Sequence, residues 1–212
     1  MPFPIQSLFV NTNGIRLHVA VAGPADGPPV VLLHGFPEFW YGWRHQIEPL
    51  AAAGYRVIAP DQRGYNLSGK PRGVENYRVA TLATDVTGLL DALGYRQVCL
   101  AGHDWGAAVA WETAIRYPER VRRLAILNVP HPDVMSRFLL SNREQFRKSW
   151  YIYFFQLPWI PEAVLRANDW APAVQMLTQS GTPGSFTPED IEQYRRAWWR
   201  KDAMTSMLNW YR

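Results

Sequence analysis

Short apolar runs alternate with longer amphipathic segments along the first 130 residues of the chain. Four of these runs are predicted strands, and the first is a short continuous apolar run, which is typical of a strand buried on both faces of a parallel sheet. They occupy residues 28–35, 55–61, 97–102 and 123–129. Between them, apolar residues recur at helical spacing over 40–53, 79–93 and 105–118, and a glycine or a proline closes each segment. The order β-α-β-α-β-α-β predicts a mostly parallel sheet with helices on both faces.

The two ends of the chain depart from this pattern. Near the start, apolar residues at 7–11 and 15–23 flank the dipeptide Asn13-Gly14, which is a strong signal for a β-hairpin. After Pro130 no further buried strand is evident, and the sequence becomes rich in aromatic residues broken by Pro and Gly. We therefore predict the N-terminal part of an α/β core over 1–130 and a helical cap, or lid, over 131–212.

Composition and charge indicate an ordinary globular protein and give no sign of a nucleic-acid or membrane partner. The chain is 48% hydrophobic and 19% charged, as in ordinary globular proteins. Its net charge of +4 is spread along the chain, so we expect no nucleic-acid partner. No apolar stretch has the length of a membrane span, and no signal peptide is evident, so we expect no membrane partner. The single cysteine, Cys99, lies in an apolar run where we expect it to be buried, and a cytoplasmic location is expected.

The first candidate for chemistry is GHDWG at 102–106, where an aspartate follows a predicted buried strand. The pattern G-x-D-x-G resembles the nucleophile elbow G-x-S-x-G, a sharp strand-to-helix turn that presents its central side chain above the sheet. Gly102 and Gly106 allow the strand and the helix to approach closely. Asp104 then stands at a helix N-terminus, which favours a negative charge. The simpler alternative is that Asp104 only caps this helix.

The second candidate is HGFP at 34–37, which follows the strand at 28–35. In α/β-hydrolases a loop at this place contributes a second backbone N–H to the oxyanion hole. The two expected donors are the N–H groups of Phe36 and of Trp105. A Gly-Pro turn that merely ends the strand is the simpler interpretation of HGFP alone. The two motifs together, each after the appropriate strand, are much more specific than either one.

These blocks, together with LNVPHP at 127–132, resemble the α/β-hydrolase-fold epoxide hydrolases over nearly the whole chain. In that family the lid carries two tyrosines. The resemblance assigns them to Tyr151 in KSWYIYFFQ and Tyr211 in LNWYR, although Tyr153 stands close to the first. We expect the substrate pocket to include three further residues near these motifs. They are Pro37, Trp40 and Trp150.

The resemblance implies conversion of an apolar epoxide to a vicinal diol, with no cofactor and no metal. Asp104 would attack a ring carbon and form a hydroxyalkyl ester, while the phenols of Tyr151 and Tyr211 stabilise the alkoxide that forms. Water would then attack the ester, and the N–H groups of Phe36 and Trp105 would hold the oxyanion. A homodimer is one expected assembly.

Ester hydrolysis in this family requires a histidine base and a relay acid after the lid. The chain has five histidines, and none of them follows the lid segment, where this family has its base. They are His18, His34, His45, His103 and His131. We therefore expect the sequence to be part of a longer enzyme, with the relay acid, the histidine and the last strands lying beyond Arg212. By itself the chain would alkylate Asp104 and stall.

Three other families are compatible with parts of this pattern. A haloalkane dehalogenase also uses an aspartate elbow, with Trp105 holding the halide, but typically has Asn where Phe36 stands. Fluoroacetate dehalogenases carry an arginine in the place of Trp105, and ordinary esterases use serine as the nucleophile. A different class remains open as well: a catalytically inactive hydrolase fold that binds a small apolar ligand.

Overall fold

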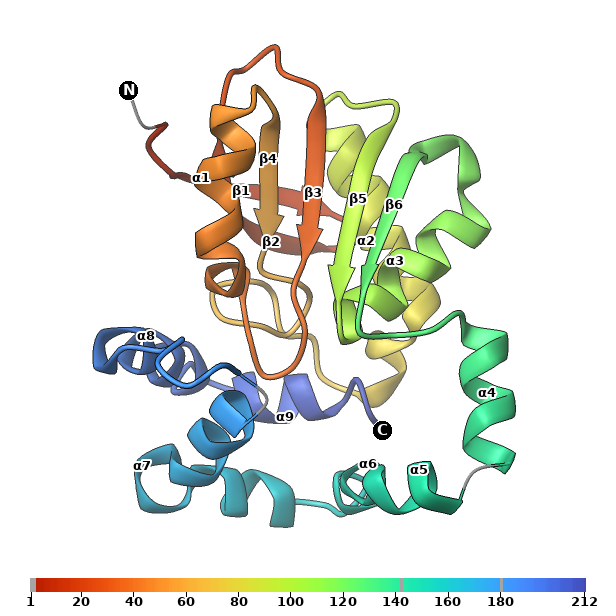
Figure 1. Cartoon of the computed structure of the whole chain (residues 1–212), viewed down its shortest axis with the longest axis vertical. Helices are drawn as coiled ribbons and strands as arrows, with labels where there is room; N and C mark the ends of the chain where they lie inside the picture. The colour runs from red at the N-terminus through yellow and green to blue at the C-terminus, as the bar shows by residue number, and fades with distance from the viewer. Residues whose placement is uncertain (1–2, 142, 180) are drawn as a thin grey trace.

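The computed structural model describes residues 3–141, 143–179 and 181–212, and in this range a six-stranded sheet is followed by a group of helices (Figure 1). The strands are β1 (Gln6–Thr12), β2 (Ile15–Ala22), β3 (Pro29–Leu33), β4 (Arg56–Pro60), β5 (Val98–His103) and β6 (Val121–Leu127). The helices of the first part are α1 (Arg44–Ala52), α2 (Val79–Ala92) and α3 (Trp105–Arg116), with 3-10 turns η1 (Trp40–Trp43), η2 (Val74–Tyr77) and η3 (Pro118–Arg120). Those of the second part are α4 (Pro132–Ser141), α5 (Arg143–Lys148), α6 (Trp150–Phe154), α7 (Ile160–Gln179), α8 (Pro188–Trp198) and α9 (Ala203–Leu208).

The strand order is β1-β2-β4-β3-β5-β6. Strands β3, β4, β5 and β6 run parallel, whereas β1 and β2 pair antiparallel, and β2 pairs antiparallel with β4. The predicted mostly parallel sheet is confirmed, as is the hairpin at Asn13-Gly14. Both residues of this turn have positive φ, at 42° and 73°, which suits the right-handed twist of a tight hairpin.

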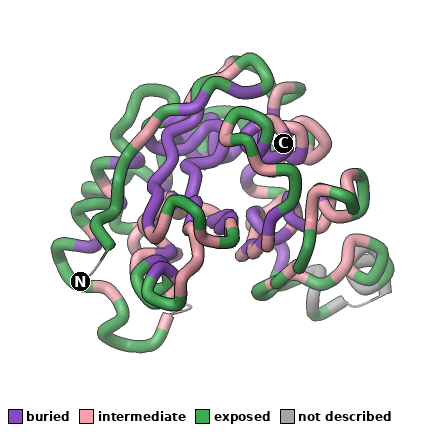
Figure 2. The backbone as a smooth tube through the Cα atoms, turned by 90° about the horizontal axis from the view of Figure 1, so that it is seen from above, coloured by how far each residue is buried: buried purple, intermediate pink, exposed green. Residues whose placement is uncertain are grey.

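Helices cover both faces of the sheet, as predicted. One hydrophobic cluster contains Val31 and Leu33 of β3 together with residues of α2 and α3, and a second contains Val30 and Leu32 together with residues of α1. Successive side chains of a strand point to opposite faces, so β3 is apolar throughout because both of its faces are buried. Burial is greatest along these central strands and the helices against them (Figure 2).

Two details differ from the sequence expectations. Cys99 is half-buried rather than buried, because it lies on β5 beside a surface hollow that Tyr55 and Leu124 also line. Residues 40–53 form a 3-10 turn before the α-helix, so only 44–52 are α-helical.

Helices α4–α9 lie beyond the carboxyl ends of the parallel strands, below the arrowheads in Figure 1. Buried apolar residues of these helices, including Leu165, Trp170 and Trp198, belong to the same hydrophobic cluster as α2 and α3. In the described ranges no helix combines the length and the apolar character needed to cross a bilayer.

Candidate active site

Asp104 stands at the turn between β5 and α3 in a strained backbone conformation, with φ 52° and ψ −124°. The two flanking glycines are required by close packing rather than by their own torsion angles. A Cβ at position 106 would lie 2.2 Å from the carbonyl oxygen of Leu33, and one at position 102 would lie 2.3 Å from the carbonyl oxygen of Gly106. The turn therefore has the geometry of a nucleophile elbow, held between β3 and α3.

The loop after β3 reaches the side chain of Asp104. The backbone N–H of Phe36 donates a hydrogen bond to Asp104 Oδ1 at 2.8 Å, and the N–H of the adjacent Trp105 acts to lower the pKa of the same carboxyl. A Cβ at Gly35 would come within 2.4 Å of the Asp104 Cβ, so only glycine fits there. Of the two predicted donors, Phe36 thus bonds to this carboxyl directly, and Trp105 acts on its pKa.

The environment of Asp104 acts on its pKa in two directions. Burial raises the pKa, because removing the carboxylate from water disfavours its charge. The hydrogen bonds from the N–H groups of Phe36 and Trp105, and the nearby His103, oppose that rise. The net effect is a pKa above the usual aspartate range.

Tyr151 of α6 and Tyr211, in the turn after α9, both lie near enough to Asp104 for its charge to act on their phenols. Their ring centroids lie 6.0 Å apart, and the ring of Tyr211 stands edge-on to Trp105 at 5.1 Å. Burial, followed by the charge of Asp104, raises the pKa of both phenols. By contrast, Tyr153 is 57% exposed. Phenols with a raised pKa keep their protons, so both tyrosines are hydrogen-bond donors beside an acidic group.

Two residues that sequence reasoning did not single out hold Tyr211 in place. The indole N–H of Trp210 donates to the carbonyl oxygen of Arg63 at 3.0 Å. The Arg212 guanidinium pairs with Glu162 of α7, with 2.9 Å between Nη1 and Oε1. These contacts join residues far apart in the sequence, so no local pattern signals them.

The three expected pocket residues occupy different surroundings. Pro37 is buried at the end of the HGFP loop, where its carbonyl oxygen accepts the indole N–H of Trp198 at 2.7 Å. Trp40 is half-buried at the start of η1. Trp150 is 63% exposed, and its place in a substrate pocket stays a prediction. Adjacent residues on a helix point about 100° apart, so α6 turns Trp150 outward when Tyr151 faces inward.

Two of the five histidines flank the elbow and already have partners. The Nε2 atom of His34 accepts the backbone N–H of Gln62 at 3.0 Å, and its Nδ1 bonds to the carbonyl oxygen of Gly35 at 3.0 Å. Burial lowers the pKa of His34, so its neutral form is favoured. His103 pairs with Glu38 at 3.2 Å, and that carboxylate raises the pKa of His103. His34 is thus a structural hydrogen-bonding group with no free ring nitrogen.

Comparison with known proteins gives a consistent result. A family model described as alpha/beta hydrolase fold matches residues 28–197. The chain is 54% identical over 208 residues to AB hydrolase superfamily protein YfhM of Bacillus subtilis, covering 98% of this chain and 73% of that protein. It is 40% identical over 208 residues to Epoxide hydrolase 4 of Homo sapiens, covering 96% of this chain and 57% of that protein.

Solved structures agree with these matches. An epoxide hydrolase of Bacillus megaterium in complex with an inhibitor superposes with a TM-score of 0.90 at 35% sequence identity, covering 97% of this chain and 71% of that one. The chain spans little more than half of the human relative and about three quarters of the bacterial one. This chain therefore belongs to the α/β hydrolase fold family, among its epoxide hydrolases.

Proposed function

We propose that this chain carries out the ring-opening step of an epoxide hydrolase. In this step an apolar epoxide forms a covalent ester with Asp104. One observation carries the proposal: the half-buried carboxyl group of Asp104 accepts the N–H of Phe36, and its charge acts on two half-buried phenols, Tyr151 and Tyr211. A carboxylate facing two proton donors suits attack on a strained ether whose oxygen must be protonated as the ring opens.

The first step follows from this arrangement. One oxygen of the Asp104 carboxylate attacks a ring carbon, the carbon–oxygen bond of the epoxide breaks, and a phenol gives its proton to the alkoxide. The rings of Phe36, Trp105 and Phe155 lie close to Tyr211, which favours an apolar or aryl substituent on the epoxide. We further propose that residues 131–212 act as the lid that supplies both tyrosines.

The second step would use the same donors. When the ester forms through one carboxyl oxygen, the other becomes the ester carbonyl, and the N–H groups of Phe36 and Trp105 stand where its oxyanion would develop. Hydrolysis also needs a base for water. His34 has both ring nitrogens engaged, and Glu38 raises the pKa of His103, which favours an imidazolium that cannot accept a proton from water. We therefore propose that residues 1–212 alone form the ester and retain it.

Intact mass spectrometry after incubation with styrene oxide tests the proposal. We expect one hydroxyalkyl adduct per chain, mapped to Asp104, and its absence from Asp104→Asn. The matched control is Asp26→Asn, at an exposed aspartate, which should still form the adduct. An adduct that persists in Asp104→Asn contradicts the assignment of the nucleophile, and steady diol production by this chain contradicts the retained ester. Faster reaction with a bromoalkane than with the epoxide would favour a dehalogenase.

The roles of the lid tyrosines can be tested with three Tyr→Phe variants. We expect Tyr151→Phe and Tyr211→Phe each to slow adduct formation by on the order of 10²-fold, because each removes a donor to the forming alkoxide. Tyr153→Phe is the matched control on the same helix, and its rate should stay close to wild type because that side chain is 57% exposed. Equal slowing in all three variants would show that the phenols act only through packing.

A further inference from the structure

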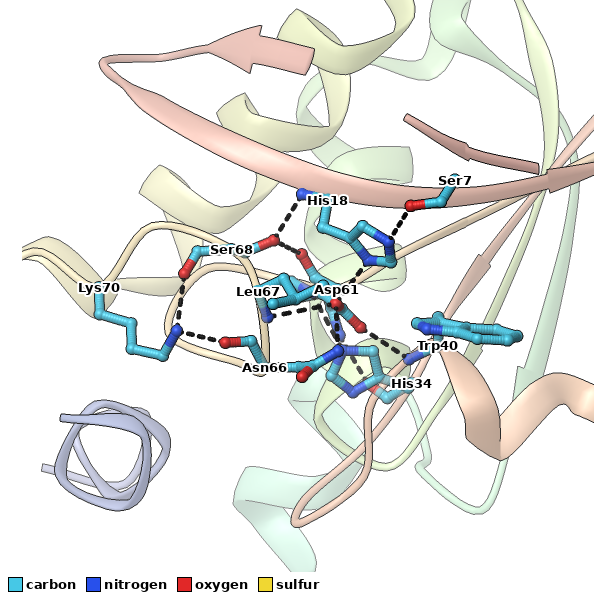
Figure 3. Close-up of polar contacts among 10 residues, drawn as sticks. Ser7, His18, His34, Trp40, Asp61, Asn66, Leu67, Ser68 and Lys70 are labelled. Atoms are coloured by element: carbon cyan, nitrogen blue, oxygen red, sulfur yellow. Dashed lines mark hydrogen bonds and ion pairs between the residues drawn. The ribbon is translucent and has the colours of Figure 1, made fainter. Parts of the chain in front are cut away.

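Three polar side chains near the β1 edge of the sheet form a continuous hydrogen-bonded row (Figure 3). Ser7 Oγ lies 2.7 Å from His18 Nε2, and His18 Nδ1 lies 2.7 Å from Asp61 Oδ2. The three residues come from β1, β2 and the position after β4, which are adjacent in the sheet. A hydroxyl, an imidazole and a carboxyl in this order form the constellation that activates a serine nucleophile.

The surroundings of Asp61 determine which nitrogen of His18 carries the proton. Asp61 is fully buried, its Oδ2 accepts the side-chain amide of Asn66 at 2.8 Å, and its Oδ1 accepts the N–H of Trp40 at 3.1 Å. Because these neighbours are donors, the carboxyl group acts as an acceptor. His18 therefore donates from Nδ1 to Asp61, and the lone pair of Nε2 faces the hydroxyl of Ser7.

Exposure differs sharply between the base and the hydroxyl. The side chain of His18 is 4% exposed, and the ring of Phe9 packs edge-on against it with centroids 5.4 Å apart. Phe9 pairs with His18 across the hairpin, so Ser7 lies two residues along on the same face. Ser7 itself is exposed. A reagent thus reaches the hydroxyl directly, while the imidazole is shielded from water.

We propose that Ser7 is a second nucleophile of this protein, activated by His18 and Asp61, which accepts acyl groups from small activated aryl esters. The Ser7 Oγ–acyl bond forms as the proton of the hydroxyl passes to His18 Nε2. The acyl–oxygen bond of the ester then breaks, His18 Nε2 returns the proton to the leaving oxygen, and the phenol departs. The site lies on β1, whereas Asp104 follows β5, so this proposal does not rest on epoxide chemistry at Asp104.

The position on an outer strand limits the class of substrate. An exposed strand surface gives little enclosure for a bulky acyl group or for the oxyanion of a poor leaving group. A phenolate leaves without strong assistance, so a small aryl ester such as p-nitrophenyl acetate suits this site better than an amide or an alkyl ester.

Peptide mapping after brief treatment of the unmodified chain with p-nitrophenyl acetate tests the proposal. Ser185, an exposed serine in the loop before α8, is the control inside the same molecule. A positioned general base contributes about 10²–10⁴-fold to such a step, so Ser7 should be acetylated more than about tenfold faster than Ser185. A ratio below about tenfold overturns the proposal.

Two variants separate activation from mere exposure. Ser7→Ala should remove the fast acetylation without altering the circular dichroism spectrum, since the side chain is exposed. His18→Gln should slow acetylation of Ser7 by about 10²-fold and leave the rate at Ser185 unchanged. Equal rates at Ser7 in wild type and in a folded His18→Gln would overturn the role of His18. If that variant does not fold, the ratio of Ser7 to Ser185 in the wild-type chain decides the question.

Discussion

The conformation of Asp104 is costly by itself and is maintained by its neighbours. A non-glycine residue with φ 52° and ψ −124° costs on the order of 1–3 kcal/mol. The absence of a Cβ at Gly35, Gly102 and Gly106 lets the surrounding backbone close around the turn, and the hydrogen bond from the N–H of Phe36 holds the carboxyl. Burial at this turn gives the aspartate its raised pKa.

A pH dependence follows from the raised pKa of Asp104. The folded protein keeps the proton on this carboxyl to a higher pH than the unfolded chain does. The stability contributed by the protonated form is present below the unfolded pKa and is lost as pH rises through the folded pKa. Only the carboxylate attacks an epoxide, so the rate of adduct formation should rise with pH through a midpoint above the ordinary value of about 3.9.

Initial rates of adduct formation with styrene oxide, measured by intact mass across the acid range, give this midpoint. Urea unfolding of Asp104→Asn and wild type over the same range provides a second measurement. The stability of the variant relative to wild type should increase as pH rises through the midpoint. A midpoint at or below the ordinary aspartate value would contradict the effect of burial.

At the scale of elements, α8 begins with a reciprocal cap that also links it to the core. Thr187 Oγ1 accepts the N–H of Asp190 at 3.1 Å, and Asp190 Oδ2 accepts the N–H of Thr187 at 2.8 Å. The other oxygen of Asp190 accepts the hydroxyl of Tyr41 at 2.8 Å and pairs with Arg44 at 3.0 Å. One carboxylate therefore caps α8 and fastens it to η1 and α1.

Removing this cap should weaken the fold by a modest amount. Thr187→Ala removes the acceptor for a helix N–H and should lower the free energy of unfolding by about 1 kcal/mol, measured by urea denaturation. Thr182→Ala, at an exposed threonine of the preceding loop, is the control and should leave it nearly unchanged. Similar losses in both variants would mean that the side-chain cap contributes no stability of its own.

At the scale of the whole molecule, buried indoles join the helical region to the sheet region. The N–H of Trp198 donates to the carbonyl of Pro37, and that of Trp210 donates to the carbonyl of Arg63. Both tryptophans belong to the hydrophobic cluster that also contains residues of β3, α2 and α3. We expect the two regions to unfold together, because they share this core.

Trp198→Phe tests this connection. The change leaves the buried carbonyl of Pro37 without its donor, and it should lower the free energy of unfolding by roughly 1–3 kcal/mol in denaturant titrations. It should also slow adduct formation at Asp104, because Pro37 adjoins Phe36. Trp159→Phe, at a side chain that is 81% exposed, is the control. A separate early transition of the helical region in wild type would contradict unfolding as one unit.

The local pattern of apolar residues and glycines was sufficient to predict the sheet, the hairpin and the elbow. The continuous apolar runs predicted the parallel strands, Asn13-Gly14 predicted the hairpin, and the glycines around Asp104 predicted the elbow. The approach of Phe36 to Asp104 also follows from pattern, since the carboxyl ends of adjacent parallel strands meet at one edge of a sheet. In each case the physical cause lies within a few residues or within one strand pairing, so the sequence expresses it directly.

Only the tertiary structure decided which side chains of the lid lie at the carboxyl edge of the sheet, near Asp104. Trp150, Tyr151 and Tyr153 share little more than one helical turn, and only the seating of α6 on the core turns Tyr151 inward and exposes the other two. Ser7, His18 and Asp61 come from β1, β2 and the position after β4. No local sequence motif predicts that these three side chains form a hydrogen-bonded row. Such arrangements depend on packing between distant segments, and composition and periodicity carry no information about that packing.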